Sequence, residues 1–303
     1  MKYKVLITAP YFQLVVDQFR KRFEDSNIEL VVPKVNERMS EGELIPLVGD
    51  IDGILCGDDR ITEKVLDAAP KLKVVVKWGT GIDSIDKKAA EARGIPVRNT
   101  PNAFTEPVAD SVLGYILCFA RDIINLDRKM RDGIWIKKLT IALNECTLGI
   151  IGLGNVGSAV KKRAEAFGTR VIVNDIKEMD FDFMVSLEKL LKESDFVSIN
   201  CDLNPTSRHL INKKTLSIMK PTAYIINTAR GHIIKESDLI EALESKVIAG
   251  AALDVFENEP LPVDSPLLKM ENVILSPHNT NGSPRAWENV HANSIKQILE
   301  ILK

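Results

Sequence analysis

Residues 148–157, Leu-Gly-Ile-Ile-Gly-Leu-Gly-Asn-Val-Gly, constrain the fold of this chain more than any other segment. A short apolar run, typical of a strand buried on both faces, leads directly into a Gly-x-Gly-x-x-Gly turn. Apolar residues at helical spacing follow, and Gly168 comes just after the last of them, where a helix end favours glycine. This order predicts a strand, a tight turn and a helix, which is the first half of a βαβ unit.

Three glycines and the first residues of the predicted helix indicate a site for the phosphates of a dinucleotide. Gly152 allows the tight turn, Gly154 lets the backbone approach a pyrophosphate, and Gly157 lets the helix pack closely on its strand. The helix begins near Asn155 and Val156, where free backbone N–H groups and a partial positive charge favour an anion. Glycines that merely form a tight turn are the alternative interpretation.

An acidic residue indicates which dinucleotide binds. The second strand of the unit, residues 170–174, is followed by Asp175, 18 residues after Gly157. A carboxylate at this place hydrogen-bonds the 2′-hydroxyl of the ribose and repels a 2′-phosphate. Lys177 could soften that repulsion, but we expect NAD rather than NADP as the cofactor.

The composition excludes several classes of protein. The chain has 303 residues, enough for about two domains, and a net charge of −2, so no basic field favours nucleic acid. The apolar segment 111–120 is flanked by charges and is far too short to span a membrane. No metal site is expected. The cysteines form no C-x-x-C pair and are expected to be reduced thiols of a cytoplasmic protein; they are Cys56, Cys118, Cys146 and Cys201.

The first 98 residues alternate short β-rich runs with helical patterns, which predicts a parallel sheet covered on both faces. Strands are expected at 5–7, 29–32, 53–56, 73–77 and 96–98, and helices at 11–23, 43–48, 61–69 and 87–93. Ligands of such sheets bind at the carboxyl ends of the strands. The turn after the fourth strand, Trp78-Gly79-Thr80-Gly81, is therefore a candidate anion-binding nest, with a plain turn as the alternative.

One long helical pattern begins at Thr105 or Glu106 and continues to Leu126. It exceeds the usual length of a globular helix and is rich in apolar residues. We expect it to link two domains and to supply a dimer contact, or else to be a buried helix within one domain.

Three successive strands of the dinucleotide-binding region are expected to present polar side chains at one edge of the sheet. The strands at 224–227, 249–253 and 273–275 are followed by Arg230, Asp254 and His278. Because the carboxyl ends of parallel strands share one edge, these side chains should lie at the cofactor-binding edge. A last helix, residues 285–302, is expected to return to the first domain.

His278, Glu259 and Arg230 form the candidate catalytic set. A carboxylate beside an imidazole favours the charged ring and suits proton transfer near neutral pH. An arginine can bind a carboxylate through two parallel hydrogen bonds. With NAD, these groups predict hydride transfer coupled to proton transfer on a carbonyl acid. The other histidines are expected to be structural: His209, His232 and His291.

Several segments together resemble the D-isomer-specific 2-hydroxyacid dehydrogenase family, with phosphoglycerate dehydrogenase-like members nearest in appearance. Beside the glycine motif and Asp175, the resembling segments are Ile226-Asn227-Thr228-Ala229-Arg230-Gly231, Ala251-Ala252-Leu253-Asp254-Val255-Phe256-Glu257 with Glu259-Pro260, Ser276-Pro277-His278, Trp78-Gly79-Thr80-Gly81-Ile82-Asp83 with Ile85-Asp86, and Asn99-Thr100-Pro101. The match extends from about residue 50 to residue 280, and the combination is highly specific.

The resemblance implies two doubly wound α/β domains with parallel sheets. A flavodoxin-like substrate domain would comprise residues 1–98 and 282–303, and a Rossmann NAD-binding domain residues 99–281. The domains would close on the cofactor across a hinge. The resemblance also implies a homodimer built on the linker helix.

The resemblance further implies a role for each residue of the site. His278 would exchange a proton with the substrate, Glu259 would hold and charge its ring, and Arg230 would bind the carboxylate. Thr228, Ala229 and Asp254 would contact the cofactor, with Asp254 at the nicotinamide carboxamide. The substrate would contact the turn Trp78, Gly79, Thr80 and Gly81. The reaction would interconvert a D-2-hydroxy acid and its 2-keto acid.

The sequence leaves alternatives open. A non-enzymatic NAD(H)-sensing module could use the same fold, and formate or phosphonate could replace the hydroxy acid as hydride donor. Arg60 and Lys77 could bind a substrate phosphate, but as isolated charges they are expected to be solvated at the surface. The chain departs from the family in four places: Asn200-Cys201-Asp202-Leu203-Asn204 on the adenine side, Ser84, Asp110, and Asn279-Thr280-Asn281-Gly282 after His278.

Overall fold

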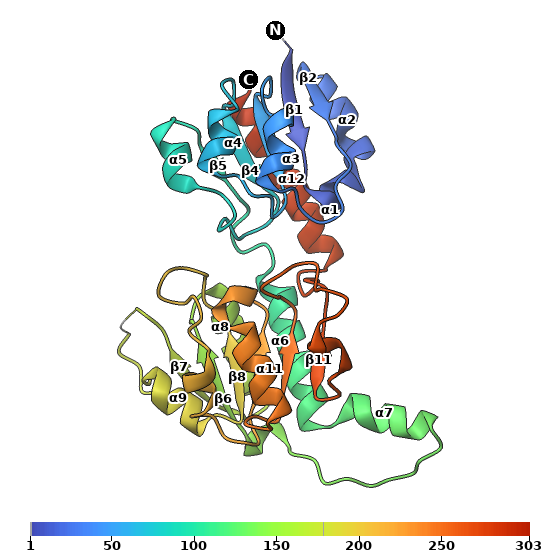
Figure 1. Ribbon diagram of the computed structural model, residues 1–303, viewed down its shortest axis with the longest axis vertical. Helices are drawn as coiled ribbons and strands as arrows, with labels where there is room; N and C mark the ends of the chain where they lie inside the picture. The colour runs from blue at the N-terminus through green and yellow to red at the C-terminus, as the bar shows by residue number, and fades with distance from the viewer. Residues whose placement is uncertain (1, 178) are drawn as a thin grey trace. The chain divides into compact units, whose positions relative to one another are not determined.

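A computed structural model describes residues 2–177 and 179–303. The chain divides into two compact units, Met1–Phe104 with Ser283–Lys303, and Thr105–Gly282. Each unit is a parallel sheet with helices packed on both faces (Figure 1). The boundaries expected after residues 98 and 281 fall shortly before the observed ones.

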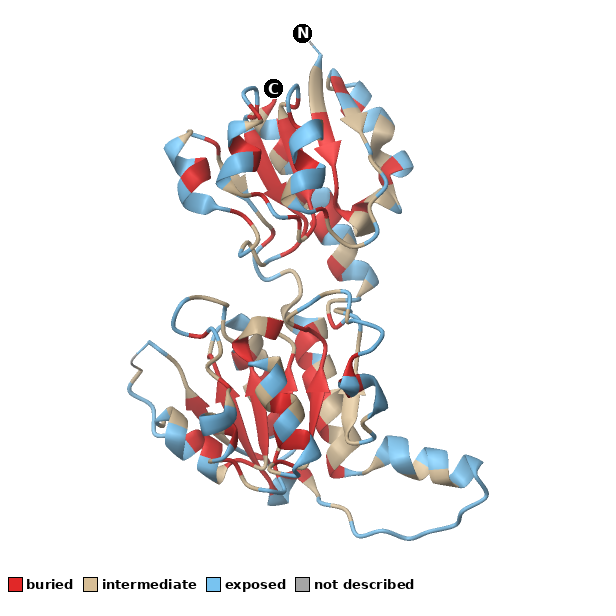
Figure 2. Cartoon of the chain, in the orientation of Figure 1, coloured by how far each residue is buried: buried red, intermediate tan, exposed pale blue. Residues whose placement is uncertain are grey.

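The first unit has the flavodoxin-like strand order β2-β1-β3-β4-β5. Its strands are β1 (Tyr3–Ile7), β2 (Ile28–Val31), β3 (Gly53–Cys56), β4 (Val74–Lys77) and β5 (Val97–Arg98). Its helices are α1 (Pro10–Gln13), α2 (Val16–Glu24), α3 (Glu41–Leu44), η1 (Ile45–Leu47), α4 (Glu63–Asp67), α5 (Lys87–Ala92) and α12 (Pro284–Ile301). The strands β3 and β4 are buried along their whole length (Figure 2), because α12 and α2 cover one face of the sheet and α3 to α5 the other.

The second unit has the strand order β11-β10-β9-β8-β6-β7. Its strands are β6 (Thr147–Ile151), β7 (Arg170–Asn174), β8 (Phe196–Ile199), β9 (Tyr224–Asn227), β10 (Gly250–Leu253) and β11 (Val273–Leu275). An isolated parallel bridge between Val173 and Met184 stands where a third Rossmann strand would pair with β7. The strand order reverses between β6 and β8, and this switch point is where doubly wound sheets bind dinucleotides. Both expected fold classes are therefore confirmed.

The helices of the second unit bury their apolar faces on both sides of this sheet. They are α6 (Thr105–Ala120), α7 (Ile123–Arg131), η2 (Leu143–Glu145), α8 (Asn155–Ala166), α9 (Leu187–Glu193), α10 (Lys213–Leu216), η3 (Gly231–Ile233), α11 (Glu236–Glu244) and η4 (Pro266–Lys269). The helix α10 begins at Lys213, because the side chain of Asn212 accepts hydrogen bonds from two backbone N–H groups of its first turn.

The long helix expected through Leu126 is interrupted. The helix α6 ends at Ala120, and Asp122 has a left-handed backbone with φ 52° before α7 begins. Aspartate tolerates this conformation because its short polar side chain can bond locally, and its carboxylate accepts a hydrogen bond from the side chain of Asn125 at 3.1 Å. The apolar periodicity continues across the break, so periodicity alone could not reveal it.

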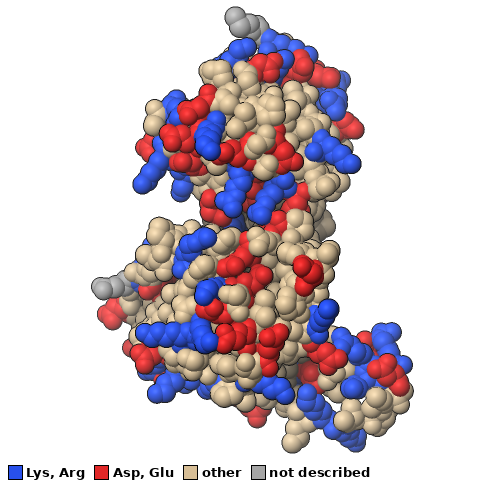
Figure 3. All heavy atoms as spheres, in the orientation of Figure 1, with Lys and Arg blue, Asp and Glu red and all other residues tan. Residues whose placement is uncertain are grey.

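The surface carries charges of both signs. On the face drawn in Figure 3, basic and acidic side chains are interspersed over each unit, in keeping with the net charge of −2. Among the residues described here, no helix is long and apolar enough to cross a membrane. All four cysteines carry free thiols.

Candidate active site

The glycine turn lies between β6 and α8 with the crowding that the motif predicts. Gly152 has φ +91°, and a Cβ there would lie 2.8 Å from the backbone N of Cys201. A Cβ on Gly157 would lie 2.0 Å from the carbonyl oxygen of Gly152. In contrast, a Cβ on Gly154 would meet nothing within 4 Å. The turn therefore keeps open space at the one glycine whose predicted role is to let a ligand approach.

Asp175 follows β7 and holds the glycine turn in place by a hydrogen bond. Its Oδ2 accepts a hydrogen bond from the backbone N–H of Leu153 at 2.6 Å, and its Oδ1 accepts one from Lys177 at 2.8 Å. The carboxylate thus lies beside the glycine turn, where a ribose would follow a pyrophosphate. Holding Leu153 is an additional role that the sequence did not predict.

The end of β8 borders the same turn. Burial raises the pKa of the Cys201 thiol to about 11, so the thiol stays protonated near neutral pH. Beside it, the buried Oδ1 atom of Asn200 has no hydrogen-bond partner among the described residues. A buried acceptor at this edge and the open space at Gly154 both fit a bound dinucleotide.

A buried asparagine shapes the loop after β9. Asn227 is fully buried, and its side chain accepts a hydrogen bond from Ala229 N at 3.1 Å and donates one to Arg230 O at 3.0 Å. The Arg230 guanidinium donates to the carbonyl oxygen of Ala229 at 2.8 Å. Asn227 therefore holds the Thr228–Arg230 loop in place. Its position at the last residue of a buried strand was the available sequence signal.

A buried aspartate shapes the loop that carries His278. Asp254 is fully buried, and its carboxylate accepts hydrogen bonds from Asn279 N at 2.8 Å, Thr280 N at 3.2 Å and Thr280 Oγ1 at 2.5 Å. The backbone N–H of His278 donates to Asp254 O at 2.8 Å. His278 itself has a left-handed backbone, with φ 51°. Three donors offset the cost of burying the carboxylate, which in turn fixes the backbone that follows the histidine.

His278 and Glu259 meet at this edge. The His278 Nδ1 atom lies 3.1 Å from Glu259 Oε2, and the two side chains are 22% and 16% exposed. The other carboxylate oxygen, Oε1, accepts a hydrogen bond from Phe256 N at 2.9 Å. A carboxylate on Nδ1 favours a proton there, so the ring would exchange its second proton at Nε2.

In the first unit, the turn after β4 is rigid. The Trp78 side chain is buried and donates from Nε1 to His291 Nδ1 at 3.0 Å. Gly79 has φ +120°, and Thr80 Oγ1 donates to Thr100 O at 3.2 Å. The Trp78 indole belongs to the core, so any substrate contact of this turn would come from its backbone or from Thr80.

The expectation of a solvated surface charge at Lys77 is wrong. Lys77 is 5% exposed, its Nζ lies 3.2 Å from Asp58 Oδ1, and it donates to Trp78 O at 3.1 Å. It is buried because it ends the inner strand β4, which an isolated charge in the sequence does not reveal. Arg60, in contrast, is exposed as expected.

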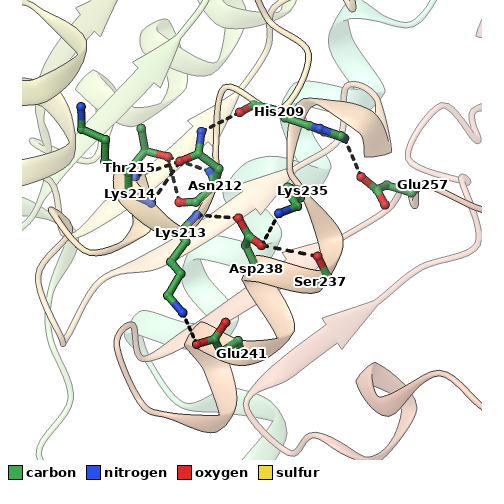
Figure 4. Close-up of polar contacts among 10 residues, drawn as sticks. All are labelled: His209, Asn212, Lys213, Lys214, Thr215, Lys235, Ser237, Asp238, Glu241 and Glu257. Atoms are coloured by element: carbon green, nitrogen blue, oxygen red, sulfur yellow. Dashed lines mark hydrogen bonds and ion pairs between the residues drawn. The ribbon is translucent and has the colours of Figure 1, made fainter.

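The remaining histidines differ from one another. His291 is buried among aromatic rings of the first unit. His209, expected to be structural, has its Nε2 atom 2.8 Å from Oε1 of Glu257 (Figure 4), and Glu257 lies two residues before Glu259 in the chain. Among the described residues, no group of three or more histidine, cysteine or acidic side chains could hold a metal ion.

Comparison with known proteins identifies the family. The sequence model of the D-isomer specific 2-hydroxyacid dehydrogenase NAD-binding domain matches residues 113–280. The chain belongs to the D-isomer-specific 2-hydroxyacid dehydrogenase family. It is thus an NAD-dependent dehydrogenase, and the residues around the glycine turn fit that cofactor.

Several members of this family are similar over nearly the whole chain. A glyoxylate reductase of Korarchaeum cryptofilum is 39% identical over 93% of this chain and 88% of its own length. A D-3-phosphoglycerate dehydrogenase of Methanocaldococcus jannaschii is 36% identical, but this chain spans only 57% of it. The structure of D-lactate dehydrogenase from Aquifex aeolicus with NAD and lactic acid has a TM-score of 0.88, with 26% identity, and covers 97% of this chain and 94% of that one.

Proposed function

We propose that the protein reduces a small, unphosphorylated 2-keto acid of the glyoxylate type to its 2-hydroxy acid with NADH. The observation that carries this proposal is the pairing of His278 with Glu259 at the edge of the NAD-binding sheet, with Arg230 on a loop of the same edge. The similarity to glyoxylate reductases supports the choice of substrate.

Each residue has a distinct part in this reaction. The bound NADH supplies the hydride to the carbonyl carbon. His278 donates a proton from Nε2 to the carbonyl oxygen, and Glu259 stabilises the charged ring before that transfer. The Arg230 guanidinium binds the substrate carboxylate and orients the carbonyl group. In the reverse direction, neutral His278 accepts the proton of the hydroxyl group.

The environment of Lys77 supports an unphosphorylated substrate. Its ammonium group is buried next to the Trp78–Gly81 turn and is paired with Asp58. A phosphate carries about two negative charges at neutral pH and needs cations that are not already neutralised. Lys77 would have to leave Asp58 to bind one, which would leave a partly buried carboxylate without its cation.

A substrate panel tests the proposal. NADH and NADPH oxidation would be measured with glyoxylate, pyruvate, hydroxypyruvate, phosphohydroxypyruvate and branched 2-keto acids, with His278→Ala as the control. We expect NADH-linked turnover that is highest on glyoxylate or hydroxypyruvate and is lost in the control. Higher kcat/KM on phosphohydroxypyruvate would contradict the substrate assignment. Tight NADH binding without turnover on any acid would favour an NAD(H) sensor.

We propose a homodimer as the assembly, with α7 and the segment that follows as the contact. This part of the second unit carries large apolar side chains in exposed positions, among them Leu139 at 99% and Trp135 at 79% exposure (Figure 2). The exposed apolar residues here are Ile123, Ile124, Met130, Ile134, Trp135, Ile136, Leu139 and Ile141. Clustered exposed apolar side chains are typical of an interface between subunits.

Light scattering after size exclusion tests the dimer. The wild-type protein should elute with twice the mass of the chain, and the pair of substitutions Trp135→Asp and Leu139→Asp should produce a monomer. The matched control is Val263→Asp, since Val263 is equally exposed but lies outside this segment. A monomeric wild-type protein at micromolar concentration would contradict the proposed assembly.

A further inference from the structure

His209 is anchored by its backbone on both sides. It follows β8 in a left-handed conformation with φ 53°. Its N–H donates to His232 O at 2.9 Å, and its carbonyl oxygen accepts from Asn212 Nδ2 at 2.8 Å. His232 lies two residues after Arg230. The backbone of His209 is therefore hydrogen-bonded to the loop that also carries the candidate catalytic arginine.

The His209 ring reaches the loop after β10. Its Nε2 lies 2.8 Å from Glu257 Oε1, with the side chains 37% and 25% exposed, and Figure 4 shows the ring and the carboxylate pointing toward each other. Glu257 lies two residues before Glu259. The glutamates of two histidine–glutamate pairs, this one and the proposed catalytic one, thus lie on the same short segment.

The backbones of the two loops also touch. A Cβ on Gly231 would lie 2.0 Å from the carbonyl carbon of Phe256, so only glycine fits there. The N–H of Glu257 donates to Glu236 Oε2 at 3.1 Å. A small movement of the Glu257–Glu259 segment therefore shifts the loop after β9, and a movement of that loop shifts the segment.

This segment also collects negative charge. Burial raises the pKa of Glu236, and the charges of Glu257 and Glu259 raise it further. Three carboxylates within mutual influence repel one another, so hydrogen-bond donors close to the segment stabilise it. His278 faces Glu259, and His209 faces Glu257.

We propose that His209 is a positioning residue for this reaction, whose bond to Glu257 holds the Glu259 carboxylate against His278. This inference rests on the proposed function for its kinetic part only. Glu259 touches the catalytic ring, whereas His209 acts through Glu257 and the backbone between the two acids.

Kinetics test the proposal with three variants. His209→Ala should lower kcat about ten- to a hundredfold, with less than about a threefold change in KM for the keto acid and for NADH, since misplacing a catalytic group by about 1 Å has effects of this size. His209→Gln, which retains an N–H near Glu257, should keep kcat within about threefold of the wild type. The matched control is Lys213→Ala, which removes the Lys213–Glu241 ion pair from the same cluster (Figure 4) and should leave kcat unchanged.

The titration of the His278 ring, followed by NMR of ring-labelled histidine, tests the proposal without any turnover. If only the His209 ring were lost, the titration midpoint of His278 would stay the same for a neutral ring and would rise for a charged one, because two positive charges repel. Displacement of Glu259 would lower it, because the charged ring loses its partner. Only the displacement of Glu259 therefore predicts a lower midpoint.

We expect the midpoint in His209→Ala to move down, toward the value in Glu259→Gln, and to stay at or above the wild-type value in His209→Gln. An unchanged or higher midpoint in His209→Ala would overturn the proposal, as would equal losses of kcat in the Ala and Gln variants. If wild-type protein turned over no keto acid, the proposed function would fail, and the midpoints would still decide the role of His209. Should His209→Ala not fold, His209→Leu, which fills the same space but cannot donate to Glu257, should lower the midpoint in the same way.

Discussion

Both units have charged side chains at the carboxyl edge of a parallel sheet, but two of them in the first unit and the candidate catalytic pair of the second lie in opposite environments. In the first unit, Asp59 and Lys77 follow or end inner strands and are almost completely buried. In the second unit, Glu259 and His278 are partly exposed, and backbone donors hold the loops around them. Position at the carboxyl edge is therefore not enough for chemistry. The side chain must also keep access to a ligand while its loop is fixed.

Two histidines make the difference concrete. His291 in the first unit accepts a hydrogen bond from Trp78 Nε1, and burial lowers the pKa of its ring, which favours the neutral form. His278 in the second unit faces a carboxylate, which favours the charged form. The same residue type is a fixed acceptor in one unit and, in the proposed reaction, a proton donor in the other.

The largest expected effect comes from changing both histidines in the same way. His278→Leu should lower kcat about 10²–10⁴-fold and leave the melting temperature nearly unchanged, because its proposed role is proton transfer. His291→Leu should do the reverse: it leaves the buried Trp78 N–H without an acceptor, which costs about 1–3 kcal/mol of stability. Steady-state kinetics and thermal unfolding of both variants measure the contrast. A comparable loss of kcat in both would break the distinction between the units.

A smaller effect is expected from one substitution at two glycines. Gly154→Ala adds a methyl group in open space with φ −74°, so stability should hold, but NADH should bind at least about tenfold more weakly, or about 1.4 kcal/mol. Gly79→Ala forces a side chain to adopt φ +120°, which should cost about 1–3 kcal/mol of stability and leave NADH affinity unchanged. Calorimetric titration and urea unfolding test both. Unchanged NADH affinity in Gly154→Ala would contradict the assigned pyrophosphate position.

Local patterns in the sequence predicted the parts of the site that depend on neighbours in the chain. The glycine turn with Asp175 and the residues that follow each strand are of this kind, since strand ends are visible as the ends of apolar runs. The role of Asp254 as the anchor of residues 279 and 280 was not predictable, because it depends on two strands pairing in register.

Burial and long-range pairing account for the rest. The burial of Lys77 was not predicted, because a charged residue at the end of an apolar run can be either buried or exposed. The pairing of His209 with Glu257 was not predictable, because the two residues are 48 positions apart and neither belongs to a strand or helix. The break at Asp122 was missed because apolar spacing continues through it. Each of these features depends on tertiary contacts that no short window of sequence contains.

The smallest expected effect is the pH dependence of stability that His291 confers on the first unit. Because burial lowers its folded-state pKa below the ordinary value of 6.5, the unfolded chain binds a proton first as the pH falls. Stability should therefore decline below about pH 6.5, by at most about 1.4 kcal/mol per pH unit for one group. Asp59 acts in the opposite direction at lower pH, because burial raises its pKa and the folded state then binds the proton first.

Urea unfolding between pH 8 and pH 5 measures this dependence. His291→Leu should be less stable than the wild type at pH 8 and should lose less stability on acidification, so that the two curves approach each other. His278→Leu, changed in the second unit, should not bring the curves together in this way, because its wild-type ring favours the charged form beside Glu259. Parallel curves for wild type and His291→Leu would show that another group causes the acid sensitivity, and the contrast between the two histidines would then rest on kinetics alone.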